Sequence, residues 1–168
     1  MELSAKTATN KDVLPWRDMY RLEMACQIIH DSIHGRPGWT QEYFLFEGDA
    51  RVGYGSIAIA GPWTGKPTVY EFYVAPRYRV RMFDLFSVLL AASGATAIET
   101  QSNDALLAVM LYTFAPGASS ESILFHDKLT TASSPPGAIV RRATPDDAAQ
   151  IVAHELDADA KWVVEAEG

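Results

Sequence analysis

The sequence is poor in three features, each of which would have pointed to a class of protein: cysteine, long apolar runs and excess basic charge. Cys26 is the only cysteine among the 168 residues, so no intrachain disulfide can form, and a reducing compartment is expected. No stretch approaches the run of about 18 apolar residues that a membrane helix needs. Residues 1–10 contain no apolar core of signal-peptide length. We therefore expect a cytoplasmic protein that has no membrane partner.

Basic residues are outnumbered. The formal net charge is -7 and the pI is about 5.0, which argues against nucleic acid as a partner because phosphate neutralisation needs a clustered basic face. One basic cluster exists, formed by Arg77, Arg79 and Arg81. It suits either a solvated loop or a site for an acidic small molecule, and the sequence leaves both readings open.

What the chain does contain is ordinary for a globular domain, with 48% hydrophobic and 21% charged residues. Hydrophobic periodicity predicts an α+β sheet with helices on its faces. Helices are expected from about Asp12 towards Ile33, after Phe83, and after the capping residue Asp104. The expected strands are Leu3–Ala8, Glu42–Glu47, Arg51–Ala60, Val69–Val74, Thr96–Thr100 and Ser122–Leu129.

The stretch Tyr70–Ala92 organises this pattern, because an apolar strand runs into an arginine-rich turn and then an apolar helix. Such a junction presents free backbone N–H groups to an anion, so a phosphate-bearing ligand is expected there. Strict alternation along the strand predicts Glu71 and Tyr73 on one face, with Tyr70 and Phe72 on the other.

A second, shorter unit is predicted at the C-terminal end. Thr130–Gly137, TTASSPPG, has the composition of a linker. Lys6–Asp12, KTATNKD, matches Arg141–Asp147, RRATPDD, at a constant offset, although chance similarity of so short a motif stays open. We therefore expect a domain over residues 1–132, a linker over 133–137, and a strand-helix-strand fragment of a second unit over 138–168.

Glu71–Asp84, EFYVAPRYRVRMFD, resembles the acetyl-CoA-binding segment of the GNAT acetyltransferase superfamily, of which ELYVHPDYRGKGIG is a typical form. The similarity lies in the glutamate, the Tyr-Val pair, the proline and the Tyr-Arg pair, and the order of elements over about residues 3–130 is similar too. Ile139–Ile151 separately resembles the opening of a second such domain. The resemblance implies a GNAT-like, mostly antiparallel central sheet flanked by helices, followed by the C-terminal fragment.

The resemblance implies an acyl-CoA-dependent N-acetyltransferase that acts on a small-molecule or peptide amine, with acetyl-CoA as co-substrate. In that reading Glu71 deprotonates the amine and Tyr112 protonates the leaving thiolate. Glu71 could instead be an exposed strand carboxylate paired with an arginine, and Tyr112 a core or surface tyrosine. The positions that the resemblance assigns to the cofactor are Tyr73, Val74, Arg77, Arg79, Val80, Arg81, Met82, Phe83 and Asn103.

Two features depart from the family pattern, the cofactor loop and the spacing of the tyrosine. The loop R-x-x-G-x-G starts at Arg79, Val80 stands where a small residue is usual, and Met82 and Asp84 stand where the glycines belong. Glycine lets backbone N–H groups approach a pyrophosphate closely, and an aspartate repels it. The family tyrosine follows the asparagine by seven residues, which from Asn103 gives Met110, about 200° around the helix from Tyr112.

These departures support an alternative, a non-catalytic GNAT-like binding or structural module that has lost acetyl-CoA turnover. The C-terminal fragment adds a second expectation. A helix with two strands cannot bury a core alone, so it is expected to pack on its own chain or to mediate a homodimer.

Three further groups of residues are weaker candidates. His30 and His34 stand four apart, but no metal is expected because no third ligand accompanies them in a known spacing. The tetrad Gln101–Asp104 follows an apolar strand and suits either ligand contact or helix capping. The aromatic residues that could line a substrate cleft, or lie in the core, are Trp39, Tyr43, Trp63 and Tyr70.

Overall fold

The computed structural model describes residues 1–24, 31–120, 137–148 and 162–165. The chain divides into two compact units, Met1–Leu124 and Phe125–Gly168. Among the described residues, none of the helices combines the length and apolar character needed to cross a membrane. The expected strand Ser122–Leu129 lies outside the described residues.

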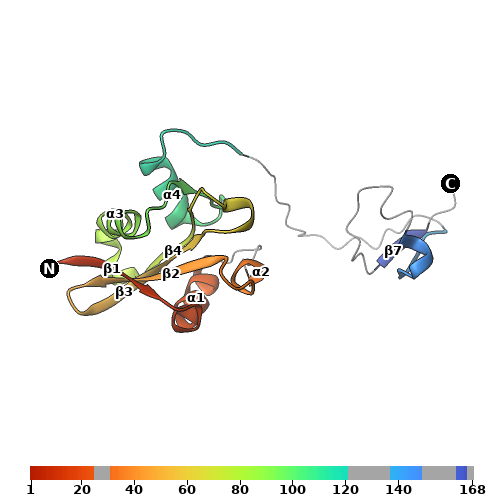
Figure 1. The fold of residues 1–168 in the computed structure, drawn as a ribbon, viewed down its shortest axis with the longest axis horizontal. Coiled ribbons are helices and arrows are strands. Elements are labelled where there is room, and N and C mark those ends of the chain that lie inside the picture. Colours follow the sequence, from red (N-terminus) through yellow and green to blue (C-terminus); the bar gives the residue numbers. More distant parts are fainter. Residues whose placement is uncertain (25–30, 121–136, 149–161, 166–168) are drawn as a thin grey trace. The chain divides into compact units, whose positions relative to one another are not determined.

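The first unit is built on a five-stranded sheet in the order β1-β2-β3-β4-β5 (Figure 1). Neighbours pair antiparallel except β4 and β5, which are parallel. This confirms the α+β, mostly antiparallel architecture. The strands are β1 (Leu3–Ala8), β2 (Thr40–Glu47), β3 (Ala50–Ala58), β4 (Thr68–Val74) and β5 (Ala97–Ile98).

Helices cover both faces of the sheet: α1 and α2 lie on one side, and α3 and α4 on the other (Figure 1). The helix that was expected to reach Ile33 is described as α1 (Asn10–Met24) and the single turn α2 (Asp31–His34), and the residues between them lie outside the described part. Helix α3 is Met82–Ser93 and α4 is Ala105–Phe114, while short 3-10 helices form η1 (Gly61–Trp63) and η2 (Pro76–Arg81).

Local chemistry explains where these elements begin and end. Gly48 has φ 59° and makes the β2–β3 hairpin turn that the sequence predicts. The Asp104 side chain accepts a hydrogen bond of 3.0 Å from the Leu107 backbone N–H, which confirms it as the cap of α4. β5 is shorter than the predicted Thr96–Thr100, because it pairs with β4 at only two positions, Thr68 and Val69.

Side chains of β4 alternate between the two faces of the sheet and pack against the helices on each face. Phe72 packs edge-on against Phe86 of α3, with ring centroids 4.9 Å apart. Tyr73 points to the other face, where it packs edge-on against Trp16 and Tyr20 of α1. The strand is buried along its whole length, so its side chains are fixed by packing on both sides.

The second unit contains a two-stranded antiparallel sheet of β6 (Ile139–Arg142) and β7 (Trp162–Glu165), with the 3-10 turn η3 (Pro145–Asp147). Its two strands lie where the sequence places them, and the helix expected between them falls mostly outside the described residues. The Thr144 backbone N–H donates to Asp147 Oδ2 at 2.6 Å. In the first unit the Thr9 backbone N–H donates to Asp12 Oδ2 at 3.1 Å, so the two matching motifs form the same cap.

Candidate functional site

One edge of β4 carries no strand beyond its first residues. β5 pairs with Thr68 and Val69, and the Glu99 backbone N–H donates to the Val69 carbonyl at 2.9 Å. From Tyr70 to Val74, no strand in the described part of the chain pairs with this side of β4. We call this stretch the open edge of β4. Parallel strands that separate in this way leave main-chain groups beside their carboxyl ends, where α/β sheets bind ligands.

The loop predicted to hold phosphates follows the open edge directly. It forms η2, and α3 begins at Met82 with no side-chain cap on its first turn. Asp84 stands in that first turn. Val80 is 88% exposed and Phe83 40%, so both side chains are accessible to solvent.

Two of the three arginines of this loop are engaged by carboxylates of the same chain. Arg79 contacts Glu23 of α1 at 2.5 Å, and its Nε donates to the Val74 carbonyl at 3.0 Å. Arg81 pairs with Asp84 at 3.0 Å and with Glu47 at 3.3 Å. The guanidinium of the third arginine, Arg77, lies over the Tyr78 ring at 4.8 Å. A phosphate bound here would compete with these carboxylates.

Glu71 lies in the interior of the protein, with 1% of its surface exposed. Arg17 of α1 donates to both of its carboxylate oxygens at 3.0 Å. Tyr54 donates its hydroxyl to Oε2 at 3.0 Å, and His34 Nε2 lies 3.3 Å from the same oxygen. The sequence anticipated a carboxylate paired with an arginine, but at the surface, and the structure places that pair in the core.

A β-bulge decides which side chains meet Glu71. Ser56 pairs with Glu71 and the next residue, Ile57, pairs with Val69, so Tyr70 is an extra residue on β4. The Tyr70 hydroxyl is 2.7 Å from His34 Nε2, and His34 also contacts Glu71. The prediction that Tyr70 and Glu71 face opposite sides is therefore wrong, because strict alternation does not hold across the bulge.

His34 connects two buried carboxylates. Its Nδ1 lies 3.2 Å from Glu42 Oε1, and its Nε2 is the contact to Glu71 described above. Burial by itself would lower the pKa of His34, but the hydrogen bonds with Glu42 and Glu71 outweigh it and raise that pKa. With His34 protonated, the two carboxylates are balanced by two cations, Arg17 and His34.

This balance predicts a pH dependence of stability. A histidine whose folded pKa is raised stabilises the fold fully below its ordinary pKa of about 6.5, and the contribution is lost as pH rises through the folded value. Urea unfolding from about pH 6 to about pH 9 should therefore show the native protein losing its advantage over His34→Gln as pH rises. A difference between the two proteins that stays constant with pH would contradict this assignment.

The polar tetrad lies at the start of α4, and the predicted proton donor, Tyr112, lies in the last turn of that helix. Asp104 is buried and accepts a hydrogen bond of 2.9 Å from the Tyr20 hydroxyl; its desolvation raises its pKa. Asn103 is exposed beside it. On α4, Met110 is fully buried, whereas Tyr112 is 80% exposed. The structure thus brings neither Asn103 nor Tyr112 into contact with Glu71, and their roles stay predictions.

Sequence reasoning missed Arg17, His34 and Tyr54 as partners of Glu71. For Arg17 a signal was present, because it stands on the apolar stripe of α1 between Val13 and Tyr20, where a cation needs a buried partner. His34 was considered only with His30, which lies outside the described residues. Within the ranges that the structure describes, no group of three or more histidine, cysteine, aspartate or glutamate side chains could hold a metal ion.

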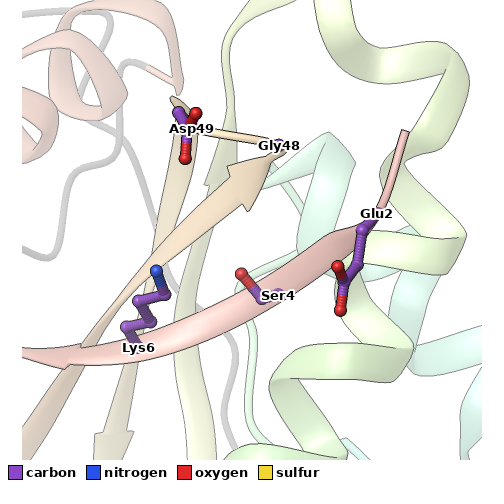
Figure 2. A pocket seen from close by; sticks show the side chains of 5 residues that line it. All are labelled: Glu2, Ser4, Lys6, Gly48 and Asp49. Carbon is purple, nitrogen blue, oxygen red and sulfur yellow. The ribbon is translucent and has the colours of Figure 1, made fainter.

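Two surface hollows lie away from this network. One, of about 280 Å³, is lined by Glu2, Ser4 and Lys6 of β1 and by Gly48 and Asp49 of the hairpin turn (Figure 2). Figure 2 shows carboxylates and an ammonium group around it, and the residues that line it come from β1 and the hairpin turn. The other, of about 120 Å³, lies by β5 and the end of α4. Neither belongs to the candidate site.

No protein-family model matches the sequence, and no curated protein matches it. Solved structures do match. Ribosomal-protein-alanine N-acetyltransferase from Brucella melitensis biovar Abortus 2308 is similar with a TM-score of 0.52 at 13% identity, over 75% of this chain and all (100%) of the other.

An aminoglycoside acetyltransferase, meta-AAC0020 from an uncultured soil metagenomic sample, matches with a TM-score of 0.47 at 10% identity, over 76% of this chain and 97% of the other. AAC(6')-Iy, solved with the bisubstrate analogue CoA-S-monomethyl-acetylneamine, has a TM-score of 0.45 at 11% identity, over 77% of this chain and 100% of its own. At sequence identities this low, structural similarity indicates the fold and not the activity. With the sheet order and the parallel β4–β5 pair, the similarity to the ribosomal-protein-alanine N-acetyltransferase structure shows that this chain has a GNAT fold.

Proposed function

We propose that this protein is an acyl-CoA-dependent N-acyltransferase that uses acetyl-CoA and a small-molecule or peptide amine. The observation that carries the proposal is the open edge of β4, which runs directly into η2 and the uncapped first turn of α3. That arrangement offers main-chain groups to an extended amide-containing chain and places the arginines of η2 beside its phosphates.

The residues proposed to hold the donor are those that the sequence predicts. The main chain of Tyr73 and Val74 would pair with the pantetheine arm, and the arginine side chains would meet the phosphates in place of glycine-framed N–H groups. Asp84 is the residue that fits worst, and its charge is offset by Arg81 at 3.0 Å. The other positions proposed to line the donor site are Arg77, Arg79, Val80, Met82, Phe83 and Asn103.

In the proposed reaction, a neutral amine attacks the thioester carbonyl, the new C–N bond replaces the C–S bond, and the thiolate leaves. Glu71 is the proposed acceptor of the ammonium proton, and Tyr112 the proposed donor to the thiolate. Arg17, Tyr54 and His34 already contact the Glu71 carboxylate, and protonating it would remove the charge that pairs with the buried Arg17 guanidinium, so proton transfer to Glu71 is opposed by its surroundings. Holding the two substrates in line therefore carries most of the proposed rate enhancement.

Acetyl-CoA should raise the melting temperature of the native protein. A ligand that binds the folded state alone stabilises it by about 2.7 kcal/mol at a concentration 100 times its dissociation constant. The measurement is thermal unfolding with and without saturating acetyl-CoA, with isothermal calorimetry to obtain the affinity. If acetyl-CoA produces neither a shift nor heat, the proposed activity is excluded.

A second candidate function is a GNAT-fold binding module without turnover. The engaged state of Glu71 favours it, because no free carboxylate is offered to an amine at that position. Thiol release from acetyl-CoA, followed with a panel of primary amines, separates the two. Binding without thiol release supports the module, and amine-dependent release supports the enzyme.

We also propose a homodimer that involves the C-terminal unit. Ile139 is 59% exposed and Val140 64%, although β-strands carry such residues to be buried. A two-stranded sheet is marginal by itself, so covering these side chains would stabilise it. Light scattering at micromolar concentration should give a dimeric mass, and a monomeric mass would count against the dimer.

A further inference from the structure

Arg79 and Glu23 form the contact that ties α1 to the end of β4. Arg79 Nη2 lies 2.5 Å from Glu23 Oε1, and the Tyr73 hydroxyl donates to the other Glu23 oxygen at 3.2 Å. The Arg79 guanidinium also lies over the Tyr73 ring at 5.7 Å, and its Nε donates to the Val74 carbonyl at 3.0 Å. Glu23, Tyr73 and Arg79 together therefore cover the last residue of the open edge of β4.

We propose that Glu23 is a latch that keeps the acyl-CoA site closed until a phosphate of the ligand takes its place on Arg79. The inference rests on the proposed function and adds a regulation of the same site. In the latched state the Arg79 guanidinium is shared between Glu23 and Val74. A ligand that lies along the open edge must compete for both.

The Arg79–Glu23 ion pair is more exposed to solvent than the Arg17–Glu71 pair in the core. The Arg79 and Glu23 side chains are 28% and 34% exposed, whereas those of Arg17 and Glu71 are 2% exposed each. A partly exposed pair is screened by water and contributes little to stability, so an incoming dianion can displace it. A phosphate offers the guanidinium the same paired oxygens as a carboxylate, with more charge. Arg79 can thus exchange one partner for the other, which Arg17 cannot.

Calorimetric titration of CoA into four proteins at one ionic strength tests the latch: the native chain, Glu23→Gln, Asp18→Asn, and Glu23→Gln with Arg79→Gln. Asp18 is exposed on the same helix as Glu23, so its replacement changes the net charge equally without touching Arg79. Removing the competing carboxylate should tighten CoA binding about fivefold, the upper range for a partly exposed ion pair. Asp18→Asn should bind as the native chain does, and the double variant should lose the gain.

The outcomes distinguish the latch from the proposed function. If Glu23→Gln binds CoA more tightly than both the native chain and Asp18→Asn, or if it alone binds, the latch is supported. If all single variants bind with the native affinity, the latch is wrong and the donor site stands. If none of the proteins binds CoA, the proposed function fails and the latch fails with it. A lower melting temperature of Glu23→Gln with unchanged CoA affinity would show that the Glu23–Arg79 ion pair stabilises the fold and does not restrict CoA binding.

Discussion

Replacing Glu71 by glutamine is expected to lower the free energy of unfolding by about 3 to 5 kcal/mol, because the change removes the carboxylate charge that pairs with the buried Arg17 guanidinium. Glutamine keeps the shape of the side chain, and its amide oxygen can still accept hydrogen bonds. The loss of stability therefore reflects the lost charge more than lost packing. Urea unfolding followed by circular dichroism measures it. Turnover and acetyl-CoA affinity should be measured at a temperature where the variant is folded.

Glu2→Gln is the matched control, since Glu2 is exposed at the start of the chain, and it should change stability by less than about 0.5 kcal/mol. Adding Arg17→Met to Glu71→Gln should recover part of the loss, because both charges of the buried pair are then removed. A Glu71→Gln protein that is as stable as Glu2→Gln, with turnover reduced and affinity intact, would contradict the structural reading and favour catalysis by Glu71.

Gly53→Ala is expected to cost about 3 kcal/mol, because the added methyl group would meet main chain that cannot turn aside. A Cβ at Gly53 would lie 2.2 Å from the Tyr73 carbonyl oxygen and 3.1 Å from Val74 Cα. β3 would have to move away from β4 at the residues proposed to pair with the donor. Unfolding midpoints measure the stability loss, and CoA titration should show weaker binding in the folded variant.

Gly117→Ala supplies the control for this change, since nothing lies within 4 Å of a Cβ built there. Its stability should equal that of the native protein or exceed it slightly, because alanine restricts the unfolded chain. Equal stability of the two alanine variants would mean that β3 and β4 are not held as closely as the structure shows.

The fold was largely accessible from the sequence because its information is local. The apolar run before Pro76 predicts β4, Gly48 predicts the hairpin, and Asp104 predicts the start of α4, and each depends on neighbours within a few residues. The resemblance around Glu71–Asp84 then indicates which sheet these elements form, and the similarity to solved GNAT structures confirms it.

The candidate site was less accessible because its contacts join distant parts of the chain. Arg17 and Glu71 are 54 residues apart, and the pair depends on how α1 crosses the sheet. The burial of Glu71 could not be predicted from alternation. Alternation assigns a side chain to one face of the sheet but does not show which element packs on that face. Arg79 illustrates the same limit: the sequence predicts a cation at the loop, and the structure supplies the carboxylate, Glu23, that already holds it.

The extra residue at Tyr70 divides β4 into two segments, and the alternation of side chains between the two faces of the sheet shifts from one segment to the other. Up to Val69 the strand has a neighbouring strand on each side, and after the bulge β3 is its only partner among the described residues. One insertion therefore separates the part of the strand that completes the sheet from the part whose edge is open. Removing the bulge would restore regular alternation along β4 and turn the Tyr70 side chain away from His34.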